Sequence, residues 1–89
     1  MDLVNAAKRG DKKTVSDCLK IFRGLKMFDY DVNKEESGNG FTALHFAATN
    51  GYLGIVEILL ENGAIIDKEN IHGYTPLYRA AQNGHLDVV

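Results

Sequence analysis

Apolar residues recur at helical spacing in two stretches of the chain, TALHFAATN at 42–50 and TPLYRAAQN at 75–83. In each stretch a leucine is followed three and four residues later by a pair of alanines, which places these side chains on one face of a helix. Each stretch begins with a threonine, which is favoured at helix N-caps, and ends with an asparagine that precedes a glycine, a common helix end. The pattern therefore predicts a short helix in each stretch.

A second helix is predicted after the first of these stretches, from about Leu53 to Glu61. This segment, LGIVEILLE, is apolar over much of its helical surface, and Asn62-Gly63 supplies the signal that ends it. The following residues 64–73, AIIDKENIHG, have the polar and glycine content of a loop. The predicted unit is thus a helix, a tight turn, a second helix and an extended loop.

The two units align without a gap when Gly40 is placed on Gly73, which gives a period of 33 residues. The matching pairs continue through the turn into the second helix, as far as Val56 and Val89. Repetition at such a period is typical of solenoid proteins, in which stacked units bury a continuous core.

The first part of the chain follows this plan less closely. NAAKRGDKKTV at 5–15 has an alanine pair and a glycine in the expected places, but Gly10 and Gly51 are 41 residues apart. The surplus of eight residues predicts either a longer second helix or an enlarged loop. We therefore predict a single domain at 1–89, which consists of a divergent N-terminal repeat at 1–36 with an insertion at about 20–30, a full repeat at 37–69 and a truncated repeat at 70–89.

The pattern G-x-T-[AP]-L-[HY]-x-A-A-x-N-G resembles the ankyrin repeat, and the resemblance covers residues 40–89. TALH at 42–45 has alanine where the family has proline, and TPLY at 75–78 has tyrosine where the family has histidine. The resemblance implies an all-α solenoid of stacked helix-turn-helix units with hairpin-like loops. It also implies a non-catalytic module or scaffold, whose concave face and loop tips bind a partner protein.

The resemblance further implies which side chains would contact that partner, namely those on the first helices and the loop tips. They are Asn39, Phe41, Phe46, Thr49 and Asn50 in the middle unit and Ile71, His72, Tyr74, Arg79, Gln82 and Asn83 in the last, while Lys8 and Arg9 occupy the equivalent places in the first. Phe41 and Tyr74 are the sharpest candidates, because each follows a loop glycine at a site where the fold does not need an aromatic ring. Packing against the neighbouring loop is the alternative role of both.

Charge is unevenly spread along the 89 residues, whose net charge is −2. Residues 1–26 contain seven lysines and arginines against three aspartates, and the remainder is acidic. Asp11 and Asp17 interrupt the basic cluster, which does not resemble a nucleic-acid platform with aromatic residues interleaved among its charges. A solvated helical face is therefore favoured over a nucleic-acid site, and no nucleic-acid partner is predicted.

No constellation of catalytic or metal-ligating residues is recognisable in the sequence. His45, His72 and His85 lie in different parts of the unit and without the spacing of metal ligands. Cys18 aligns with Leu59 of the second helix, which favours a buried apolar role over that of a nucleophile. We predict no enzyme activity, no metal and no cofactor.

The sequence also bears on location. Its longest mostly apolar stretch is far shorter than the ~20 residues of a membrane-spanning helix, and its N-terminus lacks the order of a signal peptide. The single cysteine fits a reducing compartment. We predict a cytoplasmic or nuclear protein without a membrane partner.

The last residues, LDVV, fall part-way along the second helix of the repeat plan. A terminal unit of a solenoid needs a polar outer side, so we expect a fragment of a longer array. Two other hypotheses stay open. The first is that the chain is the targeting portion of a larger enzyme or effector whose catalytic domain lies beyond residue 89. The second is that it self-associates through its uncapped C-terminal face.

Overall fold

The computed structural model describes residues 3–25, 32–36 and 38–85, with the side chains of 20–25 left out. Within these ranges the chain forms helices and no strands, as expected for an all-α protein. The helices are α1 (Leu3–Arg9), α2 (Lys12–Leu25), α3 (Ala43–Thr49), α4 (Leu53–Glu61) and α5 (Pro76–Gln82).

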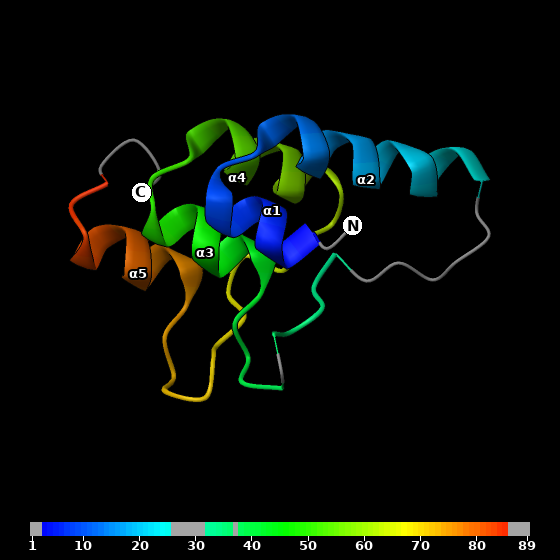
Figure 1. Cartoon of the computed structure of the whole chain (residues 1–89). Coiled ribbons are helices and arrows are strands. Elements are labelled where there is room, and N and C mark those ends of the chain that lie inside the picture. The colour runs from blue at the N-terminus through cyan, green and yellow to red at the C-terminus, as the bar shows by residue number, and fades with distance from the viewer. Residues whose placement is uncertain (1–2, 26–31, 37, 86–89) are drawn as a thin grey trace.

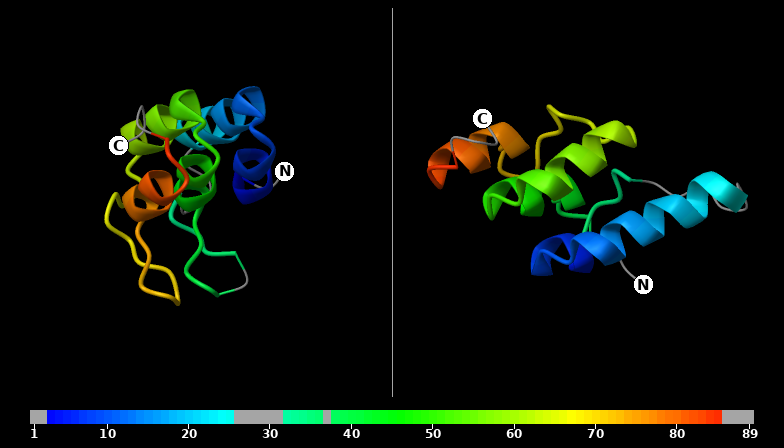
Figure 2. Two further views of the ribbon diagram at one scale, coloured as in Figure 1. Left: turned by 90° about the vertical axis from the view of Figure 1, so that its left-hand side faces the viewer. Right: turned by 90° about the horizontal axis from the view of Figure 1, so that it is seen from above.

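The helices lie in two layers (Figure 1). α1, α3 and α5 stand side by side in one layer, with α3 between the other two, and we call them the inner helices. α2 and α4 are neighbours in the outer layer, where each packs on the inner helix that precedes it in the chain. Two loops, at 32–41 and 64–74, project from the inner layer and away from the outer one (Figure 2).

The start of α3 is fixed by hydrogen bonds within four residues. Thr42 is the N-cap, with its Oγ1 accepting from the backbone N–H of His45, and the ring of His45 accepts in return from the backbone N–H of Thr42. This reciprocal arrangement is a capping box, in which two otherwise unpaired donors are satisfied. The N-terminus predicted at Thr42 is therefore confirmed.

α3 ends in the glycine-dependent manner that its Asn-Gly pair predicts. Gly51, with φ +72°, donates to the carbonyl of Ala48 at 3.2 Å, and Tyr52 donates to that of Ala47 at 2.9 Å. These two bonds form a Schellman motif, which satisfies carbonyls at the helix end and needs a left-handed residue.

The same geometry recurs one period later in α5. Thr75 is the N-cap and accepts from Tyr78 N at 3.1 Å, and Pro76 occupies the first turn, where its missing N–H has no cost. At the other end Gly84 and His85 donate to the carbonyls of Ala81 and Ala80, as Gly51 and Tyr52 do in the preceding unit. Equivalent sequence thus produces equivalent local structure.

The core lies between the two layers and between the inner helices. Its smallest members are the alanine pairs of α1 and α3, which let the helix backbones approach closely, while Leu59 of α4 is fully buried and fills the space between layers. Burial of one such leucine contributes about 2 kcal/mol to stability. The core residues of the described chain are Leu3, Val4, Ala6, Ala7, Val15, Cys18, Leu19, Val32, Ala43, Leu44, Ala47, Ala48, Ile55, Val56, Leu59 and Ala80.

The first unit departs from the plan where its sequence does. Asp11 caps α2 by accepting from the backbone N–H and the hydroxyl of Thr14, at 3.1 and 2.6 Å. These hydrogen bonds from Thr14 lower the pKa of Asp11 below its ordinary value. α2 has 14 residues against 9 in α4, so a longer second helix accounts for part of the insertion. The rest of the predicted insertion falls on residues 26–31, outside the described ranges, and the repeat boundaries stay a prediction.

Candidate functional site

The eleven residues singled out by sequence belong to the inner helices, to their C-caps and to the two projecting loops. We call the surface that these helices and loops form the inner face (Figure 2). None of the eleven residues is buried. Asn39, Phe41, Phe46, Thr49, Tyr74 and Arg79 are half-buried, and Asn50, Ile71, His72, Gln82 and Asn83 are exposed. Lys8 and Arg9 of α1 continue the same face.

The loops end in hairpins that hold each other. In the first hairpin Glu36 N donates to Phe41 O at 2.8 Å, and in the second Asn70 N donates to Tyr74 O at 3.0 Å. A bond of 2.9 Å from Ile71 N to Asn39 O joins the two hairpins. The loops therefore present their tips side by side as one surface.

Gly40 is required where these hairpins meet. Its φ is +80°, and a Cβ at this position would lie 2.6 Å from the Cα of Asn70. Both the backbone conformation and the close approach exclude an ordinary side chain. The glycine that precedes Phe41 thus sets the distance between the two loops.

Phe41 packs against α3. Its ring stacks with that of Phe46 at a centroid distance of 5.6 Å and meets the ring of His45 edge-on at 5.8 Å. The loop aromatic and the helix aromatic therefore form one half-exposed apolar surface, and both roles considered for Phe41, packing and presentation, are compatible with its position.

Tyr74 repeats this arrangement against α5. Its ring stacks on that of Tyr78 at 4.8 Å with an interplanar angle of 10°, and the guanidinium carbon of Arg79 lies 6.0 Å from its centroid. Offset aromatic pairs of this kind are favourable by about 1 kcal/mol beyond their buried area. His72 lies next to Tyr74, with 5.9 Å between ring centroids.

His45 is the buried polar group that ties these parts together, with 0% of its surface exposed. Since Thr42 N–H donates to Nδ1 at 3.1 Å, that nitrogen is an acceptor and the ring proton is on Nε2. Nε2 therefore donates to the carbonyl of Tyr74, 3.0 Å away in the next unit. Burial lowers the pKa of His45, against the opposing effect of the bond to Tyr74, so the ring is held neutral. His45 therefore has a structural role, because its two ring nitrogens join the cap of α3 to the next unit.

Asn70 is a structural residue that the sequence analysis did not single out. It is 6% exposed, and its Oδ1 accepts from His72 N at 2.8 Å and Tyr74 N at 3.1 Å, so it shapes the second hairpin. In the first hairpin Asn39 Oδ1 accepts from Phe41 N at 2.8 Å. The alignment at a period of 33 obscured this role, because the two hairpins differ in length by one residue.

Ion pairs hold the base of the loops. Lys68 Nζ lies 3.0 Å from Glu35 Oε2, and the other oxygen of Glu35 accepts from Gly40 N at 2.9 Å. The hydrogen bond and charge of Lys68 lower the pKa of Glu35. Lys8 of α1 pairs with Glu36.

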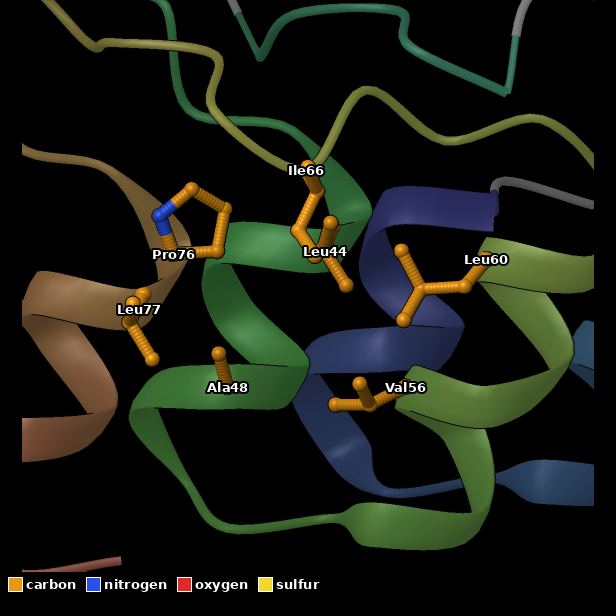
Figure 3. Close-up of a pocket in the computed structure, with 7 residues that line it drawn as sticks. All are labelled: Leu44, Ala48, Val56, Leu60, Ile66, Pro76 and Leu77. Carbon is orange, nitrogen blue, oxygen red and sulfur yellow. The ribbon is translucent and has the colours of Figure 1, made fainter. Parts of the chain in front are cut away.

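An apolar groove lies away from the inner face, between α4 and α5 (Figure 3). It is open to solvent and has a cavity volume of about 130 Å³. Leu77 of α5 is 49% exposed here, whereas its counterpart Leu44, one repeat earlier, is 2% exposed because α4 covers it. The lining residues are Leu44, Ala48, Val56, Leu60, Ile66, Pro76 and Leu77.

Other candidates from the sequence can also be placed. Cys18 is buried, as its alignment with Leu59 predicts. The residues that the structure describes contain no group of three or more His, Cys, Asp or Glu side chains that could hold a metal ion. None of the helices in these ranges has the length and apolar content needed to cross a membrane.

Comparison with known proteins identifies the fold just described. Residues 3–89 match the family described as "Ankyrin repeats (3 copies)". The chain belongs to the ankyrin-repeat family. Ankyrin repeats generally mediate protein–protein interactions, and domains built from them are typically non-catalytic. The match includes residues 3–36, where the sequence resemblance is weakest.

Two relatives of this ankyrin-repeat chain are known by name. It is 42% identical over 55 residues to Inversin of Danio rerio, an alignment that covers 62% of the chain and 5% of that protein. It is 44% identical over 36 residues to the Ankyrin repeat and LEM domain-containing protein 2 homolog of Drosophila melanogaster, covering 40% of the chain and 3% of that protein. The chain thus spans only a small part of each relative.

Proposed function

We propose that this chain is a non-catalytic module that binds a partner protein through its inner face, which is the concave face expected from sequence. The observation that carries the proposal is that Phe41 and Tyr74, which are one repeat apart, stand half-buried and each stack on an aromatic ring of the inner helix that follows. The partner rings are Phe46 and Tyr78, which occupy different positions of the repeat. Aromatic side chains are enriched among the residues that dominate binding energy at interfaces. Ile71, 65% exposed at a hairpin tip, adds an apolar contact beside them.

The mechanism of binding is preorganisation. The loop backbones are held by a hydrogen bond from Ile71 N to Asn39 O and by those that Asn70 Oδ1 accepts from the second hairpin, and the aromatic rings pack on helices. The entropy lost when a loop or side chain is ordered at an interface weakens binding by about 0.5–1.5 kcal/mol for each flexible side chain. Here that loss already occurs on folding, so less of it opposes association.

The test measures the affinity of the partner for three variants. Phe41→Ala and Tyr74→Ala should each weaken binding by about 2 kcal/mol, while the helical content measured by circular dichroism stays unchanged. Leu53→Ala is the matched control, because it removes a partly exposed apolar side chain from α4 in the outer layer. Unchanged affinity for both aromatic variants would reject the inner face as the binding site.

A second candidate is that the chain forms the targeting portion of a larger enzyme or effector. It is favoured by the lengths of the relatives, since the chain covers only 5% and 3% of the two proteins it matches. The ankyrin repeats would then bring an activity encoded elsewhere to its substrate. Reading the native coding sequence past Val89 separates the candidates, and an open reading frame without a catalytic domain would eliminate this one.

A further inference from the structure

The inner helices carry positive charge only. α1, α3 and α5 contain Lys8, Arg9 and Arg79 and no aspartate or glutamate, although the chain as a whole has a net charge of −2. This bias is local, so it does not follow from the composition of the protein. The acidic residues of the inner face lie in its loops, so the helical part of the face favours a partner of opposite charge by complementarity.

Two of these cations reach toward the central inner helix from opposite sides. Lys8 Nζ lies over the ring of Phe46, 4.7 Å from its centroid, and Arg79 Nε donates to Thr49 Oγ1 at 3.4 Å. Both cations therefore border the aromatic surface of the inner face. A ligand that covers Phe46 comes within reach of either charge.

Arg79 is the cation whose bonding is least complete. Lys8 is paired with Glu36 and Arg9 lies 3.7 Å from Asp11, but no carboxylate of the described residues is within salt-bridge distance of Arg79. The hydrogen-bond partners of Arg79 are the neutral Thr49 Oγ1 and, at 3.2 Å, Gln82 Oε1. A guanidinium has five N–H donors in a planar fork that suits a carboxylate. The donors of Arg79 that these bonds do not use are the strongest candidates on this face for an external anion.

We propose that the partner presents an extended acidic segment that crosses the inner helices, with one carboxylate on Arg79 and a second on Lys8. The inference rests on the proposed function and names the chemistry of its ligand. Helix axes in contact are about 8–10 Å apart, so α1 and α5, on either side of α3, are about 16–20 Å apart. An extended chain covers this distance in about five or six residues. The two acidic residues are thus separated by about that number, with an apolar or aromatic residue between them over Phe46.

A protein segment suits this surface better than a nucleic acid. Nucleic-acid binding draws on many phosphate contacts by lysine and arginine, whereas the inner helices offer three cations. Glu35 and Glu36 at the base of the loops would repel a continuous phosphate backbone. A peptide can place isolated carboxylates at the two cations and apolar atoms between them.

The experiment selects ligands from a random peptide library displayed on phage, with the immobilised 89-residue chain as bait. Selected peptides should be enriched in aspartate and glutamate, and their binding should weaken as NaCl rises from about 0.05 to about 0.5 M. Arg79→Gln should lower the affinity of a selected peptide about tenfold or more, because a charge-assisted hydrogen bond is lost. Lys13→Gln is the control, since it removes one positive charge from an exposed site on α2.

The outcomes separate this inference from the proposed function. Peptides that need Phe41 and Tyr74 but show no acidic enrichment and no response to Arg79→Gln would overturn the acidic ligand and leave the binding face standing. Peptides that bind the Phe41→Ala, Tyr74→Ala double variant as well as the original chain would overturn both. Displacement of the peptides by a mixed-sequence single-stranded oligonucleotide, in a manner that depends on Arg79, would show that Arg79 binds phosphate in preference to carboxylate. That result would overturn the proposal of an acidic protein segment as the ligand.

Discussion

Mild acidification should destabilise the fold through His45. Its imidazole is fully buried and neutral, and burial lowers its pKa relative to the unfolded chain, where the ordinary value is about 6.5. Below about pH 6.5 the unfolded state therefore binds a proton that the folded state resists. Stability attributable to His45 is present above this pH and is lost as the pH falls toward the folded pKa.

The size of the effect follows from the protonation of the unfolded chain. An unfolded histidine is mostly neutral at about pH 7.5, whereas at about pH 5.5 its protonated form exceeds the neutral form about tenfold. This protonation stabilises the unfolded state by about 1.4 kcal/mol. The full value applies if the folded ring stays neutral at the lower pH. Glu35 and Asp11 have lowered pKa values, so their contributions are lost as the pH falls from the ordinary carboxyl pKa toward the lowered one, which is below this window.

The assay is urea unfolding followed by circular dichroism at both pH values. The control is His45→Gln, whose amide can still accept from Thr42 and donate to the carbonyl of Tyr74 but does not titrate. Between the two pH values, the free energy of unfolding of the original chain should fall by about 1 kcal/mol more than that of this variant. His72, exposed, and His85, partly exposed, are present in both proteins and cancel in the comparison.

An equal loss in the two proteins would refute this reasoning, since it would assign the pH dependence to other groups. A direct measurement avoids reliance on the variant. The ring protons of His45 in the folded chain, followed by nuclear magnetic resonance, should titrate at lower pH than those of an unstructured histidine. Titration at or above about pH 6.5 would contradict a neutral, desolvated ring.

Three further predictions concern the caps, the loops and the apolar groove. Gly40→Ala should lower the free energy of unfolding by more than about 2 kcal/mol and Gly63→Ala by about 1 kcal/mol, because both glycines have positive φ but only a Cβ at Gly40 would meet backbone atoms. Equal losses of stability in thermal unfolding would contradict this. Thr42→Ala should lower the free energy of unfolding by about 1–2 kcal/mol and Thr75→Ala should lower it less, because only Thr42 forms a capping box. Denaturant titrations that give the reverse order would contradict this. The groove beside Leu77 should make the chain associate as its concentration rises, and Leu77→Lys should restore the monomer; a monomer mass by light scattering at every concentration of the original chain would exclude this self-association.

The helices and their ends could be predicted from sequence because the interactions that set them are local. Thr42 and Thr75 bond to residues three positions away, and the Schellman motif at Gly51 involves its immediate neighbours. The helix from Leu53 to Glu61 was predicted with the bounds that the structure has, since its apolar residues and its Asn-Gly end lie within the segment itself. Repetition at 33 residues then made the stacked arrangement predictable, because each unit covers the apolar face of its neighbour.

The candidate face was predictable only in outline. The resemblance to the ankyrin repeat placed Phe41, Tyr74 and Arg79 on one surface, and the structure adds the ring stacking and the contact between Arg79 and Thr49. The role of Asn70 was not predicted, because it depends on the hairpin backbone and the two hairpins differ in length.

By itself, then, the sequence determined the repeating unit, the helix caps and the glycine turns of this protein, since those depend on interactions within a few residues. Tertiary structure decided which polar groups are buried and what they bond. His45 reaches the carbonyl of Tyr74, 29 residues away, and Gly40 meets the backbone of Asn70. Such contacts exist only when the units are stacked, because burial and hydrogen bonding between distant residues are properties of the packed chain.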